Sequence, residues 1–369
     1  MNFPLGGSRL AIKIPMTHQT KVAIVGASGY SGEELVRLLL QHPHAELAAV
    51  TSRQHAGKEL GQVFRKFANH PRSQGLRFSE PKPELLAKAA EVVFLALPHG
   101  VAAEFAAPLI GLGCQVIDLS ADFRLKSAAV YKEFYGQDHP APELLERAVY
   151  GLPEAHRDEI EEASLIASPG CYPTSILLPV LPLLKAGLVK SGGIIADSLS
   201  GVSGAGRKVE LDYLFGECHE SARAYGIPKH RHLSEIEEQL SLAAGEPVVV
   251  QFTPHLIPIH RGILTTLYLE PARPAGQGKE MAALGEEIEG CFQAAYGAEP
   301  FVRLLDGKTL PDTKSVAGSN VIEIAWRLDG RTGRLIVLSA IDNITKGASG
   351  QAVQSMNILR GFPETAGLC

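Results

Sequence analysis

Short apolar runs alternate with segments of helical periodicity in the first part of the chain. Between the first two runs, residues 33–41 repeat leucine and valine at helical spacing, and Ser31 and Glu34 have the spacing of a capping box. The apolar runs are rich in β-branched side chains, as buried parallel strands are; they cover residues 21–25, 46–51, 91–97 and 115–119. Strands that alternate with helices predict an α/β fold with a Rossmann-type parallel sheet flanked by helices.

The pattern changes near residue 165. Residues 164–167 form another apolar run, a Pro-Gly turn follows, and residues 174–185 have helical periodicity. Residues 329–333 carry a hairpin turn signal. Further apolar strands are predicted over residues 193–199, 248–252, 263–270, 320–327 and 335–341. We therefore predict a second, α+β domain with a mixed or antiparallel sheet.

These patterns divide the chain into four parts. We expect an extension over residues 1–20, a Rossmann domain over 21–165 and a second domain over 166–342, for which the motifs below indicate dinucleotide binding and catalysis, respectively. Residues 343–369 carry a last helix that returns to the first domain. The first 20 residues contain no acid and lack the apolar core of a signal peptide, so we expect an unstructured extension or a start site upstream of Met16.

Composition narrows the class of protein. The chain has 369 residues, of which 45% are apolar and 20% charged, as in an ordinary globular protein. Its net charge of -5 gives no general attraction to nucleic acid or to an anionic membrane, and no apolar stretch is long enough to span a bilayer. The five cysteines form no CxxC pair, which favours a reducing compartment, and we expect a cytoplasmic protein.

A glycine-rich loop follows the first strand. Glycines in a strand-to-helix turn let the backbone approach a pyrophosphate, which then meets the N–H groups at the helix start. The spacing is GxxGxxG and not the commoner GxGxxG, so a glycine-rich turn without a ligand is the alternative. The residues expected to touch the cofactor are Gly26, Ser28, Gly29, Tyr30, Ser31 and Gly32.

The end of the second strand indicates which dinucleotide binds. Sites for NAD place an acid there to hold the ribose 2′-hydroxyl, but this chain has no acid between Glu46 and Glu59. Ser52 and Arg53 can instead pair with a 2′-phosphate. The sequence therefore predicts NADP(H), unless Arg53 is only a solvated surface residue.

Cys171 is the candidate nucleophile. It lies just before the predicted helix 174–185, where exposed N–H groups and the helix dipole can stabilise a thiolate. The other cysteines lack such a setting. A buried, inert cysteine is the alternative.

A nucleophilic thiolate needs a proton partner. His230 and His232 lie in a basic cluster that opens an apparent helix, and Glu235 can orient one of them. His99, His255 and His260 compete for this role on sequence grounds, and a solvated basic loop is the other alternative. His-x-His can also bind a metal, but no further ligand is suitably placed, so we expect no metal site.

Two other segments have the composition of binding loops. Arg124 follows the strand 115–119 and can clamp a carboxylate or phosphate in a bidentate manner. A second Gly/Ser loop, residues 200–207, ends in Arg207 and either approaches a ligand or is a flexible turn.

Taken together, these segments resemble one known family, the N-acetyl-gamma-glutamyl-phosphate reductases of arginine biosynthesis. The resemblance covers roughly residues 21 to 360, and no single segment decides it. The matching stretches are 26–35, 94–100, 118–125, 150–154, 169–174, 200–207, 230–232, 253–258 and 346–353.

The resemblance implies an NADPH-dependent reductive dephosphorylation of an acyl phosphate. Its catalytic cysteine falls on Cys171 and its acid/base histidine on His230, with His232 beside it. Ser168 stands where relatives often have asparagine, in the part that holds the acyl oxygen. The resemblance also implies a homodimer or homotetramer assembled through the second domain.

Several assignments stay open on sequence alone. His99 and Asn343 are candidates for contact with the nicotinamide, and Ser168, Arg124 and Arg207 for contact with the substrate. Another acyl-phosphate reductase, acting on aspartyl or N-acyl-aminoadipyl phosphate, would share the fold and chemistry. A nucleotide-binding sensor without turnover would explain the glycine loop but not the cysteine and histidines of the second domain.

Overall fold

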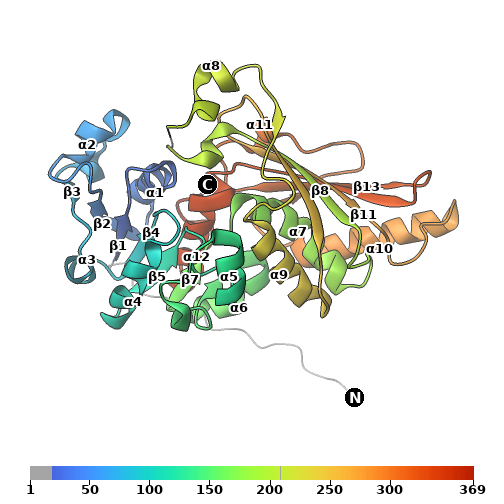
Figure 1. Ribbon diagram of the computed structural model, residues 1–369, viewed down its shortest axis with the longest axis horizontal. Coiled ribbons are helices and arrows are strands. Elements are labelled where there is room, and N and C mark those ends of the chain that lie inside the picture. Colours follow the sequence, from blue (N-terminus) through green and yellow to red (C-terminus); the bar gives the residue numbers. More distant parts are fainter. Residues whose placement is uncertain (1–18, 208) are drawn as a thin grey trace, which may run out of the picture.

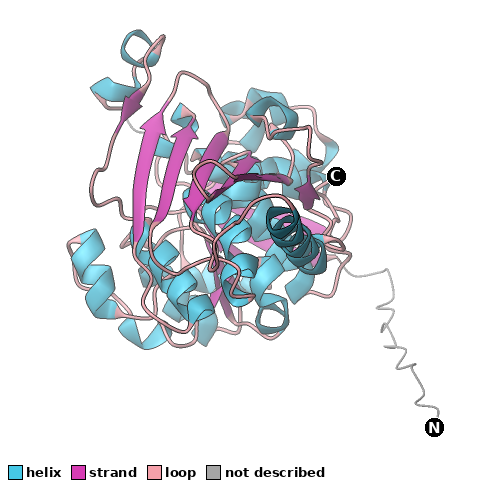
Figure 2. Ribbon diagram, turned by 90° about the vertical axis from the view of Figure 1, so that its right-hand side faces the viewer, coloured by secondary structure: helices cyan, strands magenta, loops and turns pink. Residues whose placement is uncertain are grey.

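The computed structural model describes residues 19–207 and 209–369, and the chain forms two seven-stranded sheets (Figure 1). Most of the extension predicted at the N-terminus lies outside the described residues. In Figure 2 the strands form two groups, and helices lie beside both. This arrangement confirms the predicted combination of a Rossmann-type sheet with a second, mixed sheet.

The first sheet is entirely parallel. Its strand order is β3-β2-β1-β4-β5-β7-β6, so the chain crosses over between β3 and β4 and places β1 beside both β2 and β4. Buried valine, isoleucine and leucine fill β1 and β4, because helices cover both faces of a parallel sheet. The strands are β1 Thr20–Val25, β2 Ala45–Thr51, β3 Phe78–Ser79, β4 Val92–Leu95, β5 Gln115–Asp118, β6 Val149–Tyr150 and β7 Leu165–Ala167.

The second sheet is mixed, with strand order β12-β13-β14-β11-β8-β10-β9. The pairs β13/β14, β14/β11 and β11/β8 are antiparallel, whereas β8 and β10 are parallel. Side chains alternate between the helix-covered face and the opposite face, as a half-covered sheet requires. The strands are β8 Ile194–Ser200, β9 Arg223–Ala224, β10 Val250–Leu256, β11 Ile263–Leu269, β12 Val302–Leu304, β13 Ile322–Asp329 and β14 Arg334–Ile341.

Helices α7, α9 and α10 lie along one side of the mixed sheet (Figure 1). The α-helices are α1 Tyr30–Gln41, α2 Leu60–Val63, α3 Pro83–Ala89, α4 Ala102–Gly111, α5 Ala128–Tyr135, α6 Pro153–Glu161, α7 Cys171–Lys185, α8 Phe215–Cys218, α9 Leu233–Ala244, α10 Lys279–Tyr296, α11 Thr313–Val316 and α12 Gly350–Leu359. Short 3₁₀ turns cover Arg65–Phe67, Pro71–Ser73, Pro142–Leu144, Val202–Ala205 and Leu211–Tyr213. A π-helical turn, Thr345–Ser349, precedes α12.

The last helix packs against the first sheet's core. Ala352, Val353 and Met356 of α12 are buried in the same cluster as Val22 and Leu35. The Ser349 hydroxyl, just before α12, donates to the Ser31 carbonyl at 2.9 Å. The C-terminal segment thus connects the mixed sheet with the glycine loop.

The predicted capping box is wrong. Ser31 lies inside α1, whose N-cap is Gly29, and no side chain caps this helix. Glu34 instead forms ion pairs with Arg37 at 2.6 Å and with Arg261 at 2.9 Å. The helix therefore begins with free N–H groups in the glycine loop.

Candidate active site

The glycine loop joins β1 to α1 at the carboxyl end of the parallel strands. Gly26 has a φ of +82°, and a Cβ there would lie 2.4 Å from the Ala96 carbonyl oxygen, so only glycine fits. A Cβ on Gly32 would lie 2.6 Å from the Gly26 carbonyl oxygen. The first N–H groups of α1, from Tyr30, Ser31 and Gly32, have no acceptor within the helix. This is the backbone arrangement that binds a pyrophosphate.

The end of β2 carries no acid. Ser52 is buried, and its hydroxyl lies 3.0 Å from the hydroxyl of Ser28 in the glycine loop. Arg53 is exposed, and within the described part of the chain its side chain has no hydrogen bond or ion pair. Both groups are therefore available to an anion beside the loop.

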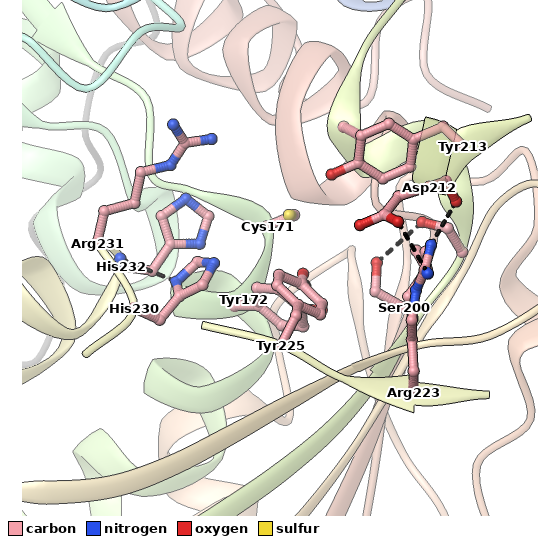
Figure 3. A pocket seen from close by; sticks show the side chains of 14 residues that line it. Cys171, Tyr172, Ser200, Asp212, Tyr213, Arg223, Tyr225, His230, Arg231 and His232 are labelled. Atoms are coloured by element: carbon pink, nitrogen blue, oxygen red, sulfur yellow. Dashed lines mark hydrogen bonds and ion pairs between the residues drawn. The ribbon is translucent and has the colours of Figure 1, made fainter. Parts of the chain in front are cut away.

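Cys171 is the first residue of α7, with Gly170 as N-cap in extended conformation. It lines a cavity of about 120 Å³ between α7, the loop after β8 and the segment before α9 (Figure 3). A Cβ on Gly170 would lie 2.7 Å from Nε2 of His232 and 2.9 Å from Arg124, so the turn needs glycine. A Cβ on Gly347 would lie 2.7 Å from Cβ of Cys171. The nucleophile is thus enclosed by two backbone segments that pass close to it.

The sequence predicts a thiolate at Cys171, stabilised by the helix start, but burial acts against the charged form. Burial raises the pKa of Cys171 to about 11, although the N–H groups of Tyr172 and of Cys171 itself and the charge of Arg124 act in the opposite direction. The stabilisation expected from the helix start is present, but the loss of solvation outweighs it. The free protein therefore holds the thiol protonated at neutral pH.

Both predicted histidines line the same cavity. Figure 3 shows the rings of His230 and His232 on one side of the Cys171 sulfur. The Nδ1 atom of His230 accepts the N–H of His232 at 3.1 Å, which leaves the proton of the neutral ring on Nε2. Burial, followed by the charge of Arg231, lowers the pKa of His230 to about 4. The pKa of His232 is lowered well below its usual range by burial and then by the charges of His230 and Arg124. Both rings are neutral at pH 7.

Glu235 holds the turn before Cys171, and among the described residues it makes no hydrogen bond to a histidine. Its Oε2 accepts from the Gly170 N–H at 3.2 Å and from the Tyr150 hydroxyl at 2.9 Å. Its Oε1 accepts from Arg124 at 2.9 Å and lies 4.0 Å from Nε2 of His232. The predicted orienting contact is therefore longer than a hydrogen bond.

Arg124 does not present a free guanidinium to the cavity. It is buried, and its three nitrogens donate to the Ser168 carbonyl at 2.8 Å, to Glu235 at 2.9 Å and to the Leu119 carbonyl at 3.0 Å. The arrangement suits a residue that fixes β5, β7 and α9 relative to one another better than a phosphate clamp. The Ser168 hydroxyl is buried without a partner among the described residues.

The remaining predicted residues lie elsewhere. Arg207 forms an ion pair with Glu33 and stacks over Tyr30, 5.0 Å from the ring centre, so it contacts the start of α1 and does not line the Cys171 cavity. Nδ1 of His99 accepts the Ala121 N–H at 3.1 Å. The buried amide of Asn343 accepts from the Gly262 N–H at 2.7 Å and donates to the Ser203 hydroxyl at 3.0 Å, so both its ends hold second-domain loops.

Sequence reasoning missed much of the cavity wall. Tyr172 directly follows the nucleophile in α7, but its side chain was assigned no role. The others lie between the second Gly/Ser loop and the histidines, where no motif marks them; they are Asp212, Tyr213, Arg223 and Tyr225. Arg231 also lines the cavity; the sequence places it between the two histidines without indicating a role. Among the described residues, no three histidine, cysteine, aspartate or glutamate side chains gather as a metal site requires.

Comparison with known proteins gives the family. Residues 21–163 match the family model of the semialdehyde dehydrogenase NAD binding domain, and residues 171–343 match that of the semialdehyde dehydrogenase dimerisation domain. An N-acetyl-gamma-glutamyl-phosphate reductase from Akkermansia muciniphila is 54% identical over 95% of this chain and 99% of its own. The chain belongs to the N-acetyl-gamma-glutamyl-phosphate reductase family. The resemblance predicted from the sequence motifs is confirmed.

Other relatives agree with this family. The reductase of the same name from Syntrophobacter fumaroxidans is 49% identical over 94% of this chain and 97% of its own. Among solved structures, aspartate semialdehyde dehydrogenase II complexed with ASA from Vibrio cholerae has a TM-score of 0.70 at 17% identity, covering 94% of this chain and 99% of its own. Aspartate semialdehyde dehydrogenase with NADP from Candida albicans has a TM-score of 0.68 at 17% identity, covering 92% of this chain and 98% of its own. These two structures share the fold.

Within the described part of the chain, no helix is long and apolar enough to cross a membrane.

Proposed function

We propose that the chain reduces N-acetyl-L-glutamyl 5-phosphate to N-acetyl-L-glutamate 5-semialdehyde with NADPH and releases phosphate, as a step of arginine biosynthesis. The observation that carries the proposal is a thiol at the start of α7 that shares a cavity with two neutral histidines. Relatives at 49–54% identity carry the name of this reaction.

The glycine loop and the end of β2 fit NADP(H). The loop residues Gly26 to Gly32 would hold the pyrophosphate at the start of α1, and Ser52 with Arg53 would hold the 2′-phosphate. We propose that His99, at the end of the loop after β4, lies on the nicotinamide side. NADPH, when bound, supplies the hydride that reduces the acyl group.

Cys171 forms the covalent intermediate. Its sulfur attacks the acyl carbon, a tetrahedral oxyanion forms, and the carbon–oxygen bond to phosphate breaks to leave a thioester. Free N–H groups at the start of α7 can stabilise the oxyanion. Because Cys171 is protonated in the free protein, the thiol must lose its proton as it attacks.

His230 and His232 are the groups that we assign to proton transfer in this reaction. Since both rings are neutral at pH 7, one of them can take the thiol proton during attack. After hydride transfer, the thiohemiacetal oxygen or the departing sulfur needs a proton, and the imidazolium formed during the attack returns it. Nδ1 of His230 accepts the His232 N–H, so the Nε2–H of His230 can donate a hydrogen bond to the reacting oxygen.

We also propose a homodimer or homotetramer located in the cytoplasm. The second domain matches a dimerisation domain. The five cysteines are all free, which suits a reducing compartment.

The test is turnover in the reverse direction. Purified protein is supplied with NADP and phosphate, and NADPH formation is followed with N-acetylglutamate semialdehyde and with aspartate semialdehyde. We expect N-acetylglutamate semialdehyde to give the higher kcat/KM. We expect Cys171→Ser to abolish turnover while NADPH still binds, because the hydroxyl is a far weaker nucleophile than the thiol. Faster turnover of aspartate semialdehyde, or a Cys171→Ser variant with near-normal turnover, would overturn the proposal.

A further inference from the structure

The Cys171 cavity contains an arginine whose side chain is not engaged. Arg231 is exposed and lines the cavity with His230 and His232. Within residues 19–207 and 209–369 its guanidinium has no hydrogen bond or ion pair. Its positive charge is therefore available to a ligand.

The other nearby arginines are occupied. Arg124 is bound to Glu235 and to two carbonyls, and Arg207 is paired with Glu33 at the start of α1. Arg223, which also lines the cavity, forms an ion pair with Asp212 at 3.1 Å. An anion that enters the cavity therefore meets one unpaired cation, Arg231. It also meets Arg223, whose ion pair with Asp212 is exposed to solvent and can be replaced by a substrate carboxylate.

The charge of Arg231 reaches both walls of the site. It contributes to the lowered pKa of His230 and His232, and it lowers the otherwise raised pKa values of Tyr135 and Tyr225. Tyr135 belongs to the first domain and Tyr225 to the second, so the guanidinium lies where the two domains meet. The ring of Tyr135 also packs edge-on against the ring of His99, with 5.5 Å between the ring centres. His99 is on the side that we assign to the nicotinamide.

Arg231 and Arg223 lie on opposite sides of the Cys171 sulfur. Figure 3 shows Arg231 and the histidines on one side of the Cys171 sulfur, and Arg223 with Asp212 on the other. The substrate of the proposed reaction also has two anionic ends, a phosphate on the reacting carbon and a carboxylate several bonds away. A substrate of this shape can span the sulfur with one end at each arginine.

We propose that Arg231 binds the phosphate of the acyl phosphate, with the carboxylate end directed toward Arg223. This inference rests on the proposed function and deepens it. The phosphate belongs beside Arg231 because proton transfer and bond breaking occur at the same carbon, and the histidines lie on that side. The guanidinium donates two N–H groups to phosphate oxygens. As the sulfur–carbon bond forms and the carbon–oxygen bond breaks, the electron pair leaves with phosphate, and Arg231 neutralises the added charge.

The reverse reaction separates the two ends of the substrate, because phosphate and semialdehyde are then independent reactants. We would measure KM for inorganic phosphate and for the semialdehyde in Arg231→Met, Arg231→Lys and Arg223→Met. Arg273→Met is the matched control, since Arg273 is a distant surface arginine paired with Glu287. Circular dichroism and NADP binding would verify the fold of each variant.

We expect Arg231→Met to raise KM for phosphate about tenfold or more, as loss of a charge-assisted hydrogen bond does, and to leave KM for the semialdehyde within about twofold. Arg231→Lys should give a smaller increase because charge remains without the planar fork. Arg223→Met should raise KM for the semialdehyde and leave KM for phosphate within about twofold. Arg273→Met should change neither KM value.

An unchanged KM for phosphate in Arg231→Met would overturn the assignment, and so would an increase confined to the semialdehyde. If Arg231→Met fails to fold, Arg231→Lys tests the assignment in its place: KM for phosphate should rise while KM for the semialdehyde stays unchanged. The proposed function fails separately, when the wild-type protein gives no phosphate-dependent NADPH formation.

Discussion

At the scale of single residues, the site depends on how burial acts on a few titratable groups. Cys171 has the helix start that favours a thiolate, but the loss of solvation leaves it protonated with a pKa of about 11. The same burial keeps His230 neutral, with a pKa of about 4. The free protein is thus set as a neutral thiol–imidazole pair, and ionisation of the thiol accompanies the attack on substrate.

The reactivity of Cys171 toward iodoacetamide should follow this pKa. Because only the thiolate is alkylated, the rate in the free protein should keep rising with pH beyond 9 and level off only near 11. The measurement is the alkylation rate of the Cys171 peptide by mass spectrometry across pH, with the exposed Cys369 as internal control. A plateau near pH 7 would show that the thiolate is stabilised in the free protein.

At the scale of elements, the nucleophile is held by segments from distant parts of the chain. Glu235 at the start of α9 accepts the Gly170 N–H, and Arg124 ties Glu235 to the carbonyl of Ser168. On another side, the π-helical turn Thr345–Ser349 brings Gly347 against Cys171. A buried ion pair between Lys346 and Glu154, 2.5 Å apart, anchors that turn.

Substitution of Gly347 by alanine should disturb the nucleophile. The added Cβ would lie 2.7 Å from Cβ of Cys171, so either the π-helical turn or the start of α7 must shift. We expect kcat to fall about 10²-fold, as small misplacements in active sites do, while NADPH still binds. The assay compares kcat and the NADPH dissociation constant for Gly347→Ala.

Gly290→Ala is the control for this change. Gly290 lies inside α10, where a Cβ would meet no atom within 4 Å, so alanine should leave kcat unchanged and stabilise the helix by up to about 1 kcal/mol. Equal kcat values in the two variants would contradict a positioning role for the turn.

The sequence allowed some of this site to be predicted, for physical reasons. Cys171 and the glycine loop were recognisable because a strand-to-helix turn is encoded by neighbouring residues. The engagement of Arg124 was not foreseen because its partner Glu235 lies 111 residues away, and no local pattern records that contact. The thiolate was expected because the helix start is visible in sequence, whereas the burial that opposes it comes from α9 and the π-helical turn.

Among the helices and strands, too, some were predictable from sequence and others were not. Long apolar strands such as β1, β11 and β14 were predicted because each buries many side chains at regular spacing. The two-residue strands β3, β6 and β9 were missed, since so short a segment carries no periodicity. The Ser31 capping box failed because the backbone of the glycine loop starts the helix earlier.

At the scale of the whole molecule, helices α7, α9 and α10 cover one face of the mixed sheet (Figure 1). Apolar side chains that point away from these helices remain partly exposed; they are Ile195, Leu199, Leu264, Tyr268, Ile336 and Leu338. Register places Leu264 opposite Leu199, and Tyr268 between Ile195 and Ile336, with Thr266 and Asp197 paired between these two rows. This mainly apolar patch, in a domain that matches a dimerisation domain, is where we expect a second copy to bind.

A charge at Leu264, within this patch, should dissociate the oligomer. In Leu264→Asp each copy of a symmetric dimer would bury an unpaired carboxylate, which is unfavourable on both sides of the interface. Sedimentation velocity should show an oligomer for the wild type and a monomer for Leu264→Asp. Leu242→Asp, at an exposed position of α9, is the control and should leave the mass unchanged. A monomeric wild type, or an unchanged mass in Leu264→Asp, would rule out this interface.

The account as a whole depends on a covalent acyl group on Cys171, which can be observed directly. The protein is mixed with N-acetylglutamyl phosphate in the absence of NADPH, quenched in acid, and the Cys171 peptide is analysed by mass spectrometry together with released phosphate. We expect this peptide to gain one N-acetylglutamyl group, about one phosphate to appear per acylated site, and the adduct to disappear when NADPH is added before quenching. An unmodified Cys171 peptide in a preparation that turns over with NADPH would contradict the thioester mechanism.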